Sequence, residues 1–187
     1  MECKKSRIFE TTEFTPMPKR PKLVVCCGVP GCGKSTYIKN YCEGFVHISF
    51  DDILVAVEGK YKFNENHNKL YRKVLNHLFV EAVVAEFDVV VDMTCSTLKS
   101  RTKWLSRLRQ LEAEHDLAPY TTTLLVFEYD LNTCVQRRES DPRANDCNWR
   151  AVISEMHERI VAEPPSENEG WDKVERIKCN GWQKSST

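Results

Sequence analysis

The stretch from Gly28 to Thr36 reads GVPGCGKST and has the residue types that bind a nucleoside triphosphate. It fits the pattern G-x-x-x-x-G-K-[S/T]. Glycines let successive backbone N–H groups point at phosphate oxygens, and the following helix N-terminus adds the positive end of its dipole. The lysine reaches the β- and γ-phosphates, and the serine hydroxyl binds Mg²⁺. We therefore predict a site for ATP and Mg²⁺. The residues predicted to form it are Gly28, Pro30, Gly31, Cys32, Gly33, Lys34, Ser35 and Thr36.

Two adjacent carboxylates, Asp51 and Asp52, follow the apolar run at 45–50. In a parallel sheet the C-terminal ends of the strands meet at the ligand crevice. A carboxylate there can take the proton of an attacking hydroxyl, as the catalytic Asp does in other phosphoryl-transfer enzymes. We predict that Asp51 is this base and that Asp52 contacts the acceptor. The alternative is that one of them caps the helix that follows, because Asp is a favoured N-cap.

Asp92 ends a second apolar run, VVVDM, and stands where phosphate-loop proteins carry the acid that steers Mg²⁺ through water. The alternative is a turn-forming Asp at a strand end. Just beyond it, Thr94 and Ser96 offer hydroxyl groups for substrate contacts.

Three arginines, Arg137, Arg138 and Arg143, lie in the polar segment CVQRRESDPR. Guanidinium groups on a closing lid stabilise the charge that builds on a transferring phosphoryl group. We predict that these arginines are catalytic. The alternative is a solvated helix end in which Glu139 and Asp141 are their ion-pair partners.

Five segments occur in an order that resembles the phosphate-loop kinase module of 5′-polynucleotide kinases, in phage-type end-healing enzymes and in polynucleotide kinase/phosphatases. These segments are GVPGCGKST, ISFDD, VVVDMT with a later RTKW, VQRRESDPR and EPPSENEGWDKVERI, and the likeness spans residues 23–179. The resemblance implies that Asp51 activates a 5′-hydroxyl and that Lys34 and Ser35 hold the donor phosphates and Mg²⁺. It also implies that Arg137, with either Arg138 or Arg143, contacts phosphates from the lid.

The same resemblance matches Arg101 and Trp104 to an R-x-x-W pattern, which makes Arg101 a candidate substrate contact. Two departures stand out. Phage-type members carry an acceptor-gripping Arg three residues after the catalytic Asp, where this chain has Leu54. The spacing of the lid arginines also differs. The chain is in addition too short to hold a phosphatase domain beside the kinase module.

Residues 99–109 contain five basic and no acidic side chains. Lys103 and Arg107 lie four residues apart, so they share one helical face and can meet the same nucleic-acid strand. The alternative is a solvated helix face.

These residues need elements that bring them together. Apolar runs predict strands at 22–28, 45–50, 88–93, 121–129 and 172–179, and helices are expected from near Lys34 to Gly44 and at 68–87. On the second helix we expect Leu70, Val74, Leu75, Leu78, Ala82 and Val83 to share one face, and Leu98, Leu105, Leu108 and Leu111 stripe the next helix. Alternating strands and helices predict an α/β fold: a three-layer phosphate-loop kinase domain with a central, mostly parallel sheet of about five strands. We expect it to span 22–182, between a flexible leader at 1–21 and a tail at 183–187.

The composition of the chain limits the classes of protein to which it can belong. The chain has 187 residues, with 27 basic and 27 acidic side chains, so no global charge attracts it to nucleic acid or membrane. No apolar stretch approaches the roughly 20 residues of a membrane span. The nine cysteines form no C-x-x-C, and the five histidines show no metal spacing. We expect reduced thiols in a cytoplasmic compartment, and no role for the histidines.

Together these features predict an ATP- and Mg²⁺-dependent kinase whose acceptor is the 5′-hydroxyl end of RNA or DNA. Two alternatives stay open. One is a related kinase that phosphorylates another hydroxyl, on an aminoacyl-tRNA, a modified base, a nucleoside or a small metabolite. The other is a nucleotide-dependent switch that has no phosphate acceptor.

Overall fold

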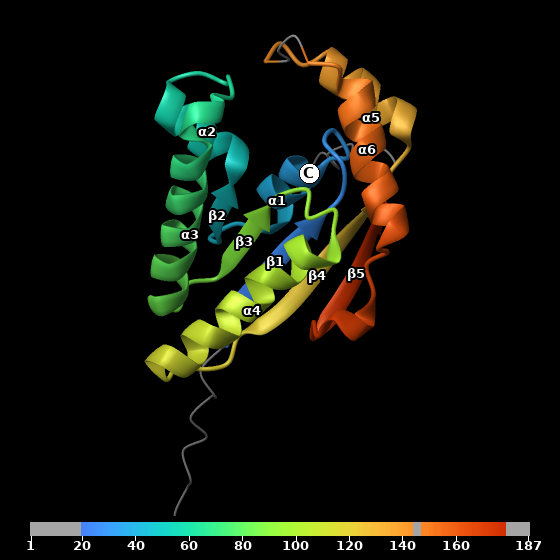
Figure 1. Cartoon of the computed structure of the whole chain (residues 1–187). Coiled ribbons are helices and arrows are strands. Elements are labelled where there is room, and N and C mark those ends of the chain that lie inside the picture. Colours follow the sequence, from blue (N-terminus) through green and yellow to red (C-terminus); the bar gives the residue numbers. More distant parts are fainter. Residues whose placement is uncertain (1–19, 144–146, 179–187) are drawn as a thin grey trace, which may run out of the picture.

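A computed structural model describes residues 20–143 and 147–178 of the chain. In this part five strands form one parallel sheet in the order β2-β3-β1-β4-β5 (Figure 1). The strands are β1 (Lys22–Cys27), β2 (Val46–Ser49), β3 (Val89–Asp92), β4 (Thr121–Glu128) and β5 (Lys173–Lys178). The predicted α/β fold with a parallel sheet is confirmed.

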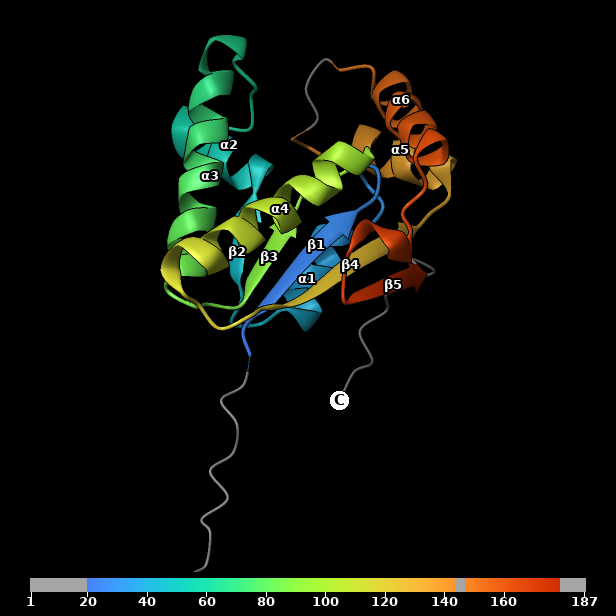
Figure 2. The same ribbon diagram turned by 60° about the horizontal axis from the view of Figure 1, so that its bottom comes forward.

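Helices cover both faces of the sheet (Figure 2). They are α1 (Lys34–Tyr41), α2 (Phe50–Glu58), α3 (Asn68–Val84), α4 (Leu98–His115), α5 (Leu131–Glu139) and α6 (Trp149–Ala162), with short 3-10 turns η1 (Glu65–His67) and η2 (Glu167–Glu169). Side chains of β1 alternate between two cores: Leu23 and Val25 pack with α3 and α4, whereas Cys26 packs with α1, α5 and α6. This alternation explains the fully apolar run of β1, because a strand covered on both faces has no solvent side.

The helical stripes differ in detail from the prediction. Leu70 and Leu98 each lie in the first turn of their helix and are largely exposed. In α3 the predicted Leu75, Ala82 and Val83 are buried, and the buried face also includes two aromatic residues, Tyr71 and Phe79, each four positions from Leu75. Their i, i+4 spacing places all three on one side of the helix, and their larger area makes that side the one facing the sheet.

Arg101 of α4 is completely buried and forms an ion pair with Glu169 of η2. Its Nε lies 2.8 Å and its Nη2 2.6 Å from the Glu169 carboxylate oxygens, and Nη2 also donates to the carbonyl oxygen of Glu163 at 2.9 Å. A guanidinium enclosed in this way does not meet a substrate. The predicted substrate contact of Arg101 is therefore corrected to an internal ion pair that fastens the segment leading into β5.

Other predictions concern the ends and the compartment. The predicted tail at 183–187 lies outside the described residues, as does the predicted leader at 1–21 except for its last two residues. None of the helices described in residues 20–143 and 147–178 combines the length and the apolar character that crossing a bilayer requires. The seven cysteines in these described ranges are free thiols.

Candidate active site

The phosphate loop joins β1 to α1 at the C-terminal edge of the sheet, between α2–α3 on one side and α5–α6 on the other (Figure 1). Gly31 and Gly33 have φ angles of 81° and 102°, in the left-handed region that favours glycine. A Cβ at Gly31 would also stand 2.6 Å from the carbonyl oxygen of Cys134 on α5. The backbone conformation at these two positions thus favours glycine, and it lets the loop surround the side chain of Lys34. Pro30 lies in this loop, and Thr36 in the first turn of α1.

Lys34 is buried within its own loop. Its Nζ donates hydrogen bonds to the carbonyl oxygens of Gly28 and Val29, each at 3.0 Å. Burial disfavours the charged ammonium, but the neighbouring Cys32 and Asp92 outweigh this effect and raise the pKa of Lys34. A charged ammonium held inside the loop is suited to meeting triphosphate oxygens.

Cys32 packs beneath this loop, fully buried, with its Sγ 3.8 Å from Lys34 Nζ. Burial raises the pKa of its thiol, so the reactive thiolate form is disfavoured. The geometry therefore favours a space-filling role for Cys32 over a redox role.

Ser35 and Asp92 meet at the head of α1, where Ser35 Oγ donates to Asp92 Oδ2 at 2.7 Å. Burial of Asp92 favours its neutral form, but the hydrogen bond from His47 and the charge of Lys34 outweigh this and lower its pKa. A hydroxyl and a carboxylate are hard oxygen ligands of the kind that Mg²⁺ prefers, which fits the predicted metal site. Within residues 20–143 and 147–178 no cluster of three or more His, Cys, Asp or Glu side chains could hold a metal ion. Mg²⁺ would accordingly depend on nucleotide phosphates and water for its other ligands.

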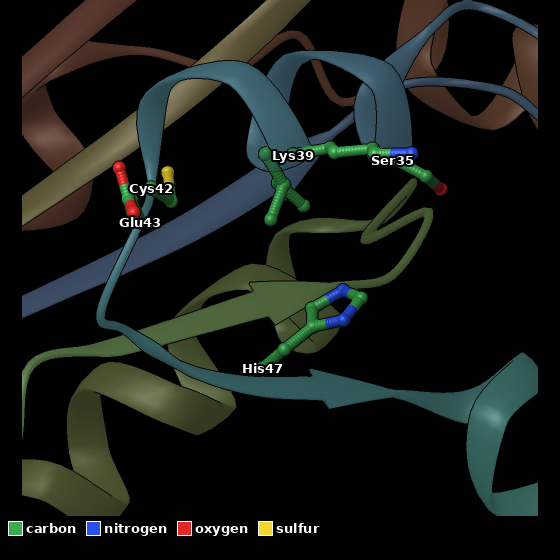
Figure 3. A pocket seen from close by; sticks show the side chains of 6 residues that line it. Ser35, Lys39, Cys42, Glu43 and His47 are labelled. Carbon is green, nitrogen blue, oxygen red and sulfur yellow. The ribbon is translucent and has the colours of Figure 1, made fainter.

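His47 of β2, which sequence analysis gave no role, belongs to this site. Its Nε2 lies 3.4 Å from Asp92 Oδ2 and its Nδ1 lies 3.3 Å from Asp52 Oδ2. The hydrogen bond with Asp92 raises the pKa of His47. Figure 3 shows the ring rising from β2 toward α1 in a cleft of about 610 Å³, with Ser35 on the α1 side. The one feature of the sequence that could have indicated a role for His47 is its position, two residues before the end of the strand that leads to Asp51.

Asp51 and Asp52 both project from the first turn of α2, but in different directions. The helix is capped by Ser49, whose Oγ accepts from the Asp52 backbone N–H at 3.2 Å. The alternative that an Asp supplies the cap is therefore wrong, and both carboxylates are exposed. Asp52 approaches His47, whereas Asp51 accepts a hydrogen bond from the hydroxyl of Tyr61 at 3.0 Å.

Thr94 contributes through its backbone. Its carbonyl oxygen accepts a hydrogen bond of 3.0 Å from the N–H of Gly28. The segment after β3 is thus hydrogen-bonded to the start of the phosphate loop. Thr94, whose hydroxyl is a predicted substrate contact, therefore lies next to the site.

The three predicted lid arginines occupy different environments. Arg137 is exposed and its Nη1 donates to the carbonyl oxygen of Gly31 at 3.2 Å, so it lies over the phosphate loop. Arg138 is buried and stacks 4.0 Å from the ring centre of Trp149. Arg143 is exposed, with Nη2 2.8 Å from Asp141 Oδ2. This pairing, together with an Arg138–Asp141 bridge of 3.1 Å, lowers the pKa of Asp141 to about 2.

The comparisons with known proteins identify the family and the fold. The model of the family AAA_33, an AAA domain, matches residues 23–162, which include every part of the cleft described above. The chain belongs to this AAA domain family. A search of the curated proteins finds no match to the chain.

Solved structures share the fold of this AAA domain. A chain of the Pnkp1/Rnl/Hen1 RNA repair complex superposes with a TM-score of 0.62 at 18% identity, covering 79% of this chain and 46% of that one. A fungal RNA kinase gives a TM-score of 0.59 at 16% identity, covering 89% and 79% of the two chains. The PezAT toxin–antitoxin system of Streptococcus pneumoniae gives 0.55 at 15%, covering 86% and 68%. The chain thus spans less than half of the matched chain in the repair complex, and the fold is that of phosphate-loop kinases.

Lys103 and Arg107 lie apart from the phosphate loop of this AAA domain. They line a hollow of about 570 Å³ between α3 and α4, with Asn76, His77, Val80, Ser106 and Gln110. Burial and the nearby charge of Arg72 lower the pKa of Lys103, which indicates that α3 adds a third cation here. Arg107 is weakly paired, 3.7 Å from Glu114. The structure therefore brings the two predicted phosphate contacts together, on one flank of the domain.

Proposed function

We propose that this protein transfers the γ-phosphate of ATP to a hydroxyl group, and that the hydroxyl is the 5′ end of RNA or DNA. The observation that carries the proposal is that one cation, Lys34, lies within the phosphate loop and another, Arg137, lies over it. The carboxylate of Asp51 on α2 is joined to Arg138, the residue after Arg137, through the hydroxyl of Tyr61. A nucleotide switch needs the loop alone. Phosphoryl transfer to an acceptor also needs a base for the attacking hydroxyl and cations for the charge of the transition state.

In the proposed reaction Asp51 accepts the proton of the acceptor hydroxyl as its oxygen forms a bond to the γ-phosphorus. The bond from that phosphorus to the bridging oxygen breaks, and ADP leaves. Lys34 and Arg137 stabilise the charge on the phosphoryl oxygens. Ser35 and Asp92 would hold Mg²⁺, which neutralises charge on the β- and γ-phosphates when bound.

The acceptor assignment rests on a cation beside the base. The guanidinium of Arg143 lies 5.2 Å from the ring centre of Tyr61, and the hydroxyl of the same Tyr61 donates to Asp51. A 5′-hydroxyl at the end of a nucleic acid always has a phosphodiester one nucleotide away. An exposed arginine next to the base suits that anion. Two structures that share this fold are described as an RNA repair complex and a fungal RNA kinase, which supports a nucleic acid as the acceptor.

One observation favours a second candidate, a kinase for a smaller hydroxyl compound. Leu54 is 4% exposed and faces the protein interior. The position at which phage-type relatives grip the acceptor phosphate therefore offers no cation in this chain. An acceptor without a phosphate would not need a cation at this position.

A transfer assay with γ-labelled ATP separates these candidates. The acceptor panel contains 5′-hydroxyl RNA and DNA oligonucleotides, the same oligonucleotides with a 5′-phosphate, tRNA, nucleosides and small alcohols. Labelling of the 5′-hydroxyl oligonucleotides, and not of the 5′-phosphorylated ones, is the expected result. Labelling confined to nucleosides or alcohols would overturn the assignment of a polynucleotide acceptor. If no acceptor is labelled, the assignment of kinase activity is overturned.

A further inference from the structure

Tyr61, in the link between α2 and η1, contacts both α2 and α5. Its hydroxyl lies 3.0 Å from Asp51 Oδ2 and 3.1 Å from Arg138 Nη2. The directions of these two hydrogen bonds follow from chemistry. An arginine only donates and an ionised carboxylate only accepts, so the hydroxyl accepts from Arg138 and donates to Asp51.

The aromatic ring of Tyr61 also contacts charged side chains. The guanidinium groups of Arg138 and Arg143 lie 5.7 Å and 5.2 Å from its centre. Asp141 forms ion pairs with both arginines, and the ring centre of Trp149 lies 4.0 Å from the guanidinium carbon of Arg138. These residues belong to residues 138–143, at and after the end of α5, and to the first residue of α6, and we call these described residues together the lid.

The lid and the wall formed by α2 and α3 stand on opposite sides of the phosphate loop (Figures 1 and 2). The bond between Tyr61 and Arg138 joins residues 77 positions apart and connects the two sides. Burial and the neighbouring charge of Asp51 raise the pKa of Tyr61, which keeps its hydroxyl protonated and able to donate.

We propose that Tyr61 is a positioning residue that couples lid closure to the orientation of the acceptor base. With the lid closed, the hydroxyl fixes Oδ2 of Asp51, which directs Oδ1 at the acceptor. The same hydroxyl, through Arg138, fixes the end of α5 and thereby Arg137 over the phosphate loop. The base and the lid cation are thus set in place by one contact. When the contact with Arg138 is broken, the Tyr61 hydroxyl is held at one end only and Asp51 is oriented less strictly, which disfavours transfer to water in the absence of an acceptor.

The kinetic test of this inference rests on the proposed function. Tyr61→Phe removes the hydroxyl and keeps the ring between the arginines, and Tyr41→Phe, on the exposed end of α1, is the matched control. We expect Tyr61→Phe to lower kcat roughly 10-fold or more for the best acceptor of the panel, because the variant cannot form the hydrogen bond to a charged group. The KM for ATP and the melting temperature should stay as in the unmutated protein. A kcat within twofold of the unmutated protein would overturn the inference.

A second measurement needs no acceptor and keeps the inference separate from the proposed function. Amide hydrogen exchange is followed for peptides that cover residues 131–143, which contain α5 and the part of the lid that follows it. Loss of the Tyr61 hydroxyl should raise their exchange severalfold in Tyr61→Phe, whereas Tyr41→Phe and peptides from α4 should be unchanged. If no acceptor is found, the proposed function fails and lid exchange alone decides on Tyr61. Unchanged exchange would then overturn the coupling.

Discussion

At the scale of single residues, the charged side chains around the phosphate loop are held by different sets of partners. Lys34 is enclosed by its own loop, Asp92 is bound by Ser35, and Asp51 faces Tyr61. Asp52 differs from Asp51 by one position yet faces His47. The 100° turn between consecutive helical residues accounts for this separation. It allows Asp51 and Asp52 to be tested independently.

Replacing Lys34 with Ala should reduce phosphoryl transfer by roughly 10²–10³-fold, because one preorganised cation is removed from the transferring phosphoryl group. The fold should persist, since the packing of the apolar core is left intact. Turnover with labelled ATP and the circular dichroism spectrum measure the two effects. Near-normal transfer by Lys34→Ala would contradict the assignment of the ATP site.

Asp51→Asn is nearly isosteric but removes the basic carboxylate. Transfer should fall by roughly 10²–10⁴-fold, the usual contribution of a general base, with little change in ATP affinity. Asp52→Asn is the matched control on the same helical turn and should have a milder effect. The measurements are single-turnover rates and nucleotide binding. Equal rates for Asp51→Asn and the unmutated protein would mean that Asp51 does not act as the base.

The sequence predicts some of these residues and not others for a physical reason. Gly33, Lys34 and Ser35 act through local backbone geometry, so their spacing alone identifies them. Asp51 and Asp92 follow from the rule that strand ends converge. Tyr61 and His47 gain their roles only from partners far away in the chain, and the contact between Tyr61 and Arg138 spans 77 positions. No local pattern encodes such a pair.

At the scale of elements, the strands are predicted more closely than the helix faces. Runs of apolar residues identify buried strands because both faces of the sheet are covered. A helix offers several apolar stripes, and the choice among them depends on what packs opposite. In α3 the aromatic Tyr71 and Phe79 determine the buried face, and Leu70 is left exposed. The burial of Arg101 could not be predicted for the same reason, because its partner in the ion pair, Glu169, comes from a separate segment near the C-terminus.

The hollow between α3 and α4 gives an element-scale prediction for the acceptor. Replacing Lys103 and Arg107 together with Ala should raise the KM for a 5′-hydroxyl oligonucleotide and leave the KM for ATP unchanged. For a single strand the slope of log KM against log salt should fall by about 1.4, because each phosphate that is no longer neutralised by a cation lowers the slope by about 0.7.

The control for this prediction removes the same charge elsewhere. Lys173→Ala with Lys178→Ala changes two exposed lysines of the edge strand β5. It should leave both KM values as they are. A silent Lys103/Arg107 double variant would show that this hollow does not bind acceptor phosphates, and nucleoside acceptors would then be the better candidates.

At the scale of the whole molecule, an ion pair joins the C-terminal strand to the rest of the domain. Arg101 on α4 and Glu169 in η2 lie 68 positions apart, with side chains 1% and 4% exposed. Trp171 packs into the same core beside α4 and leads to β5. The segment that closes the sheet at its β5 edge is thus held from one face by a buried charge pair and an aromatic side chain.

Removing one partner of this pair should destabilise the entire domain. Arg101→Met preserves much of the side-chain volume but leaves the Glu169 carboxylate buried without its cation, which costs about 3–5 kcal/mol. Arg159→Met is the matched control, because Arg159 pairs with Glu155 on the surface of α6, where an ion pair contributes about 0–1 kcal/mol. Urea unfolding followed by circular dichroism measures both. Replacing both members of the pair, Arg101→Met with Glu169→Leu, should recover part of the lost stability, because no charge is then left uncompensated. Equal midpoints for Arg101→Met and Arg159→Met would mean that the pair does not anchor β5.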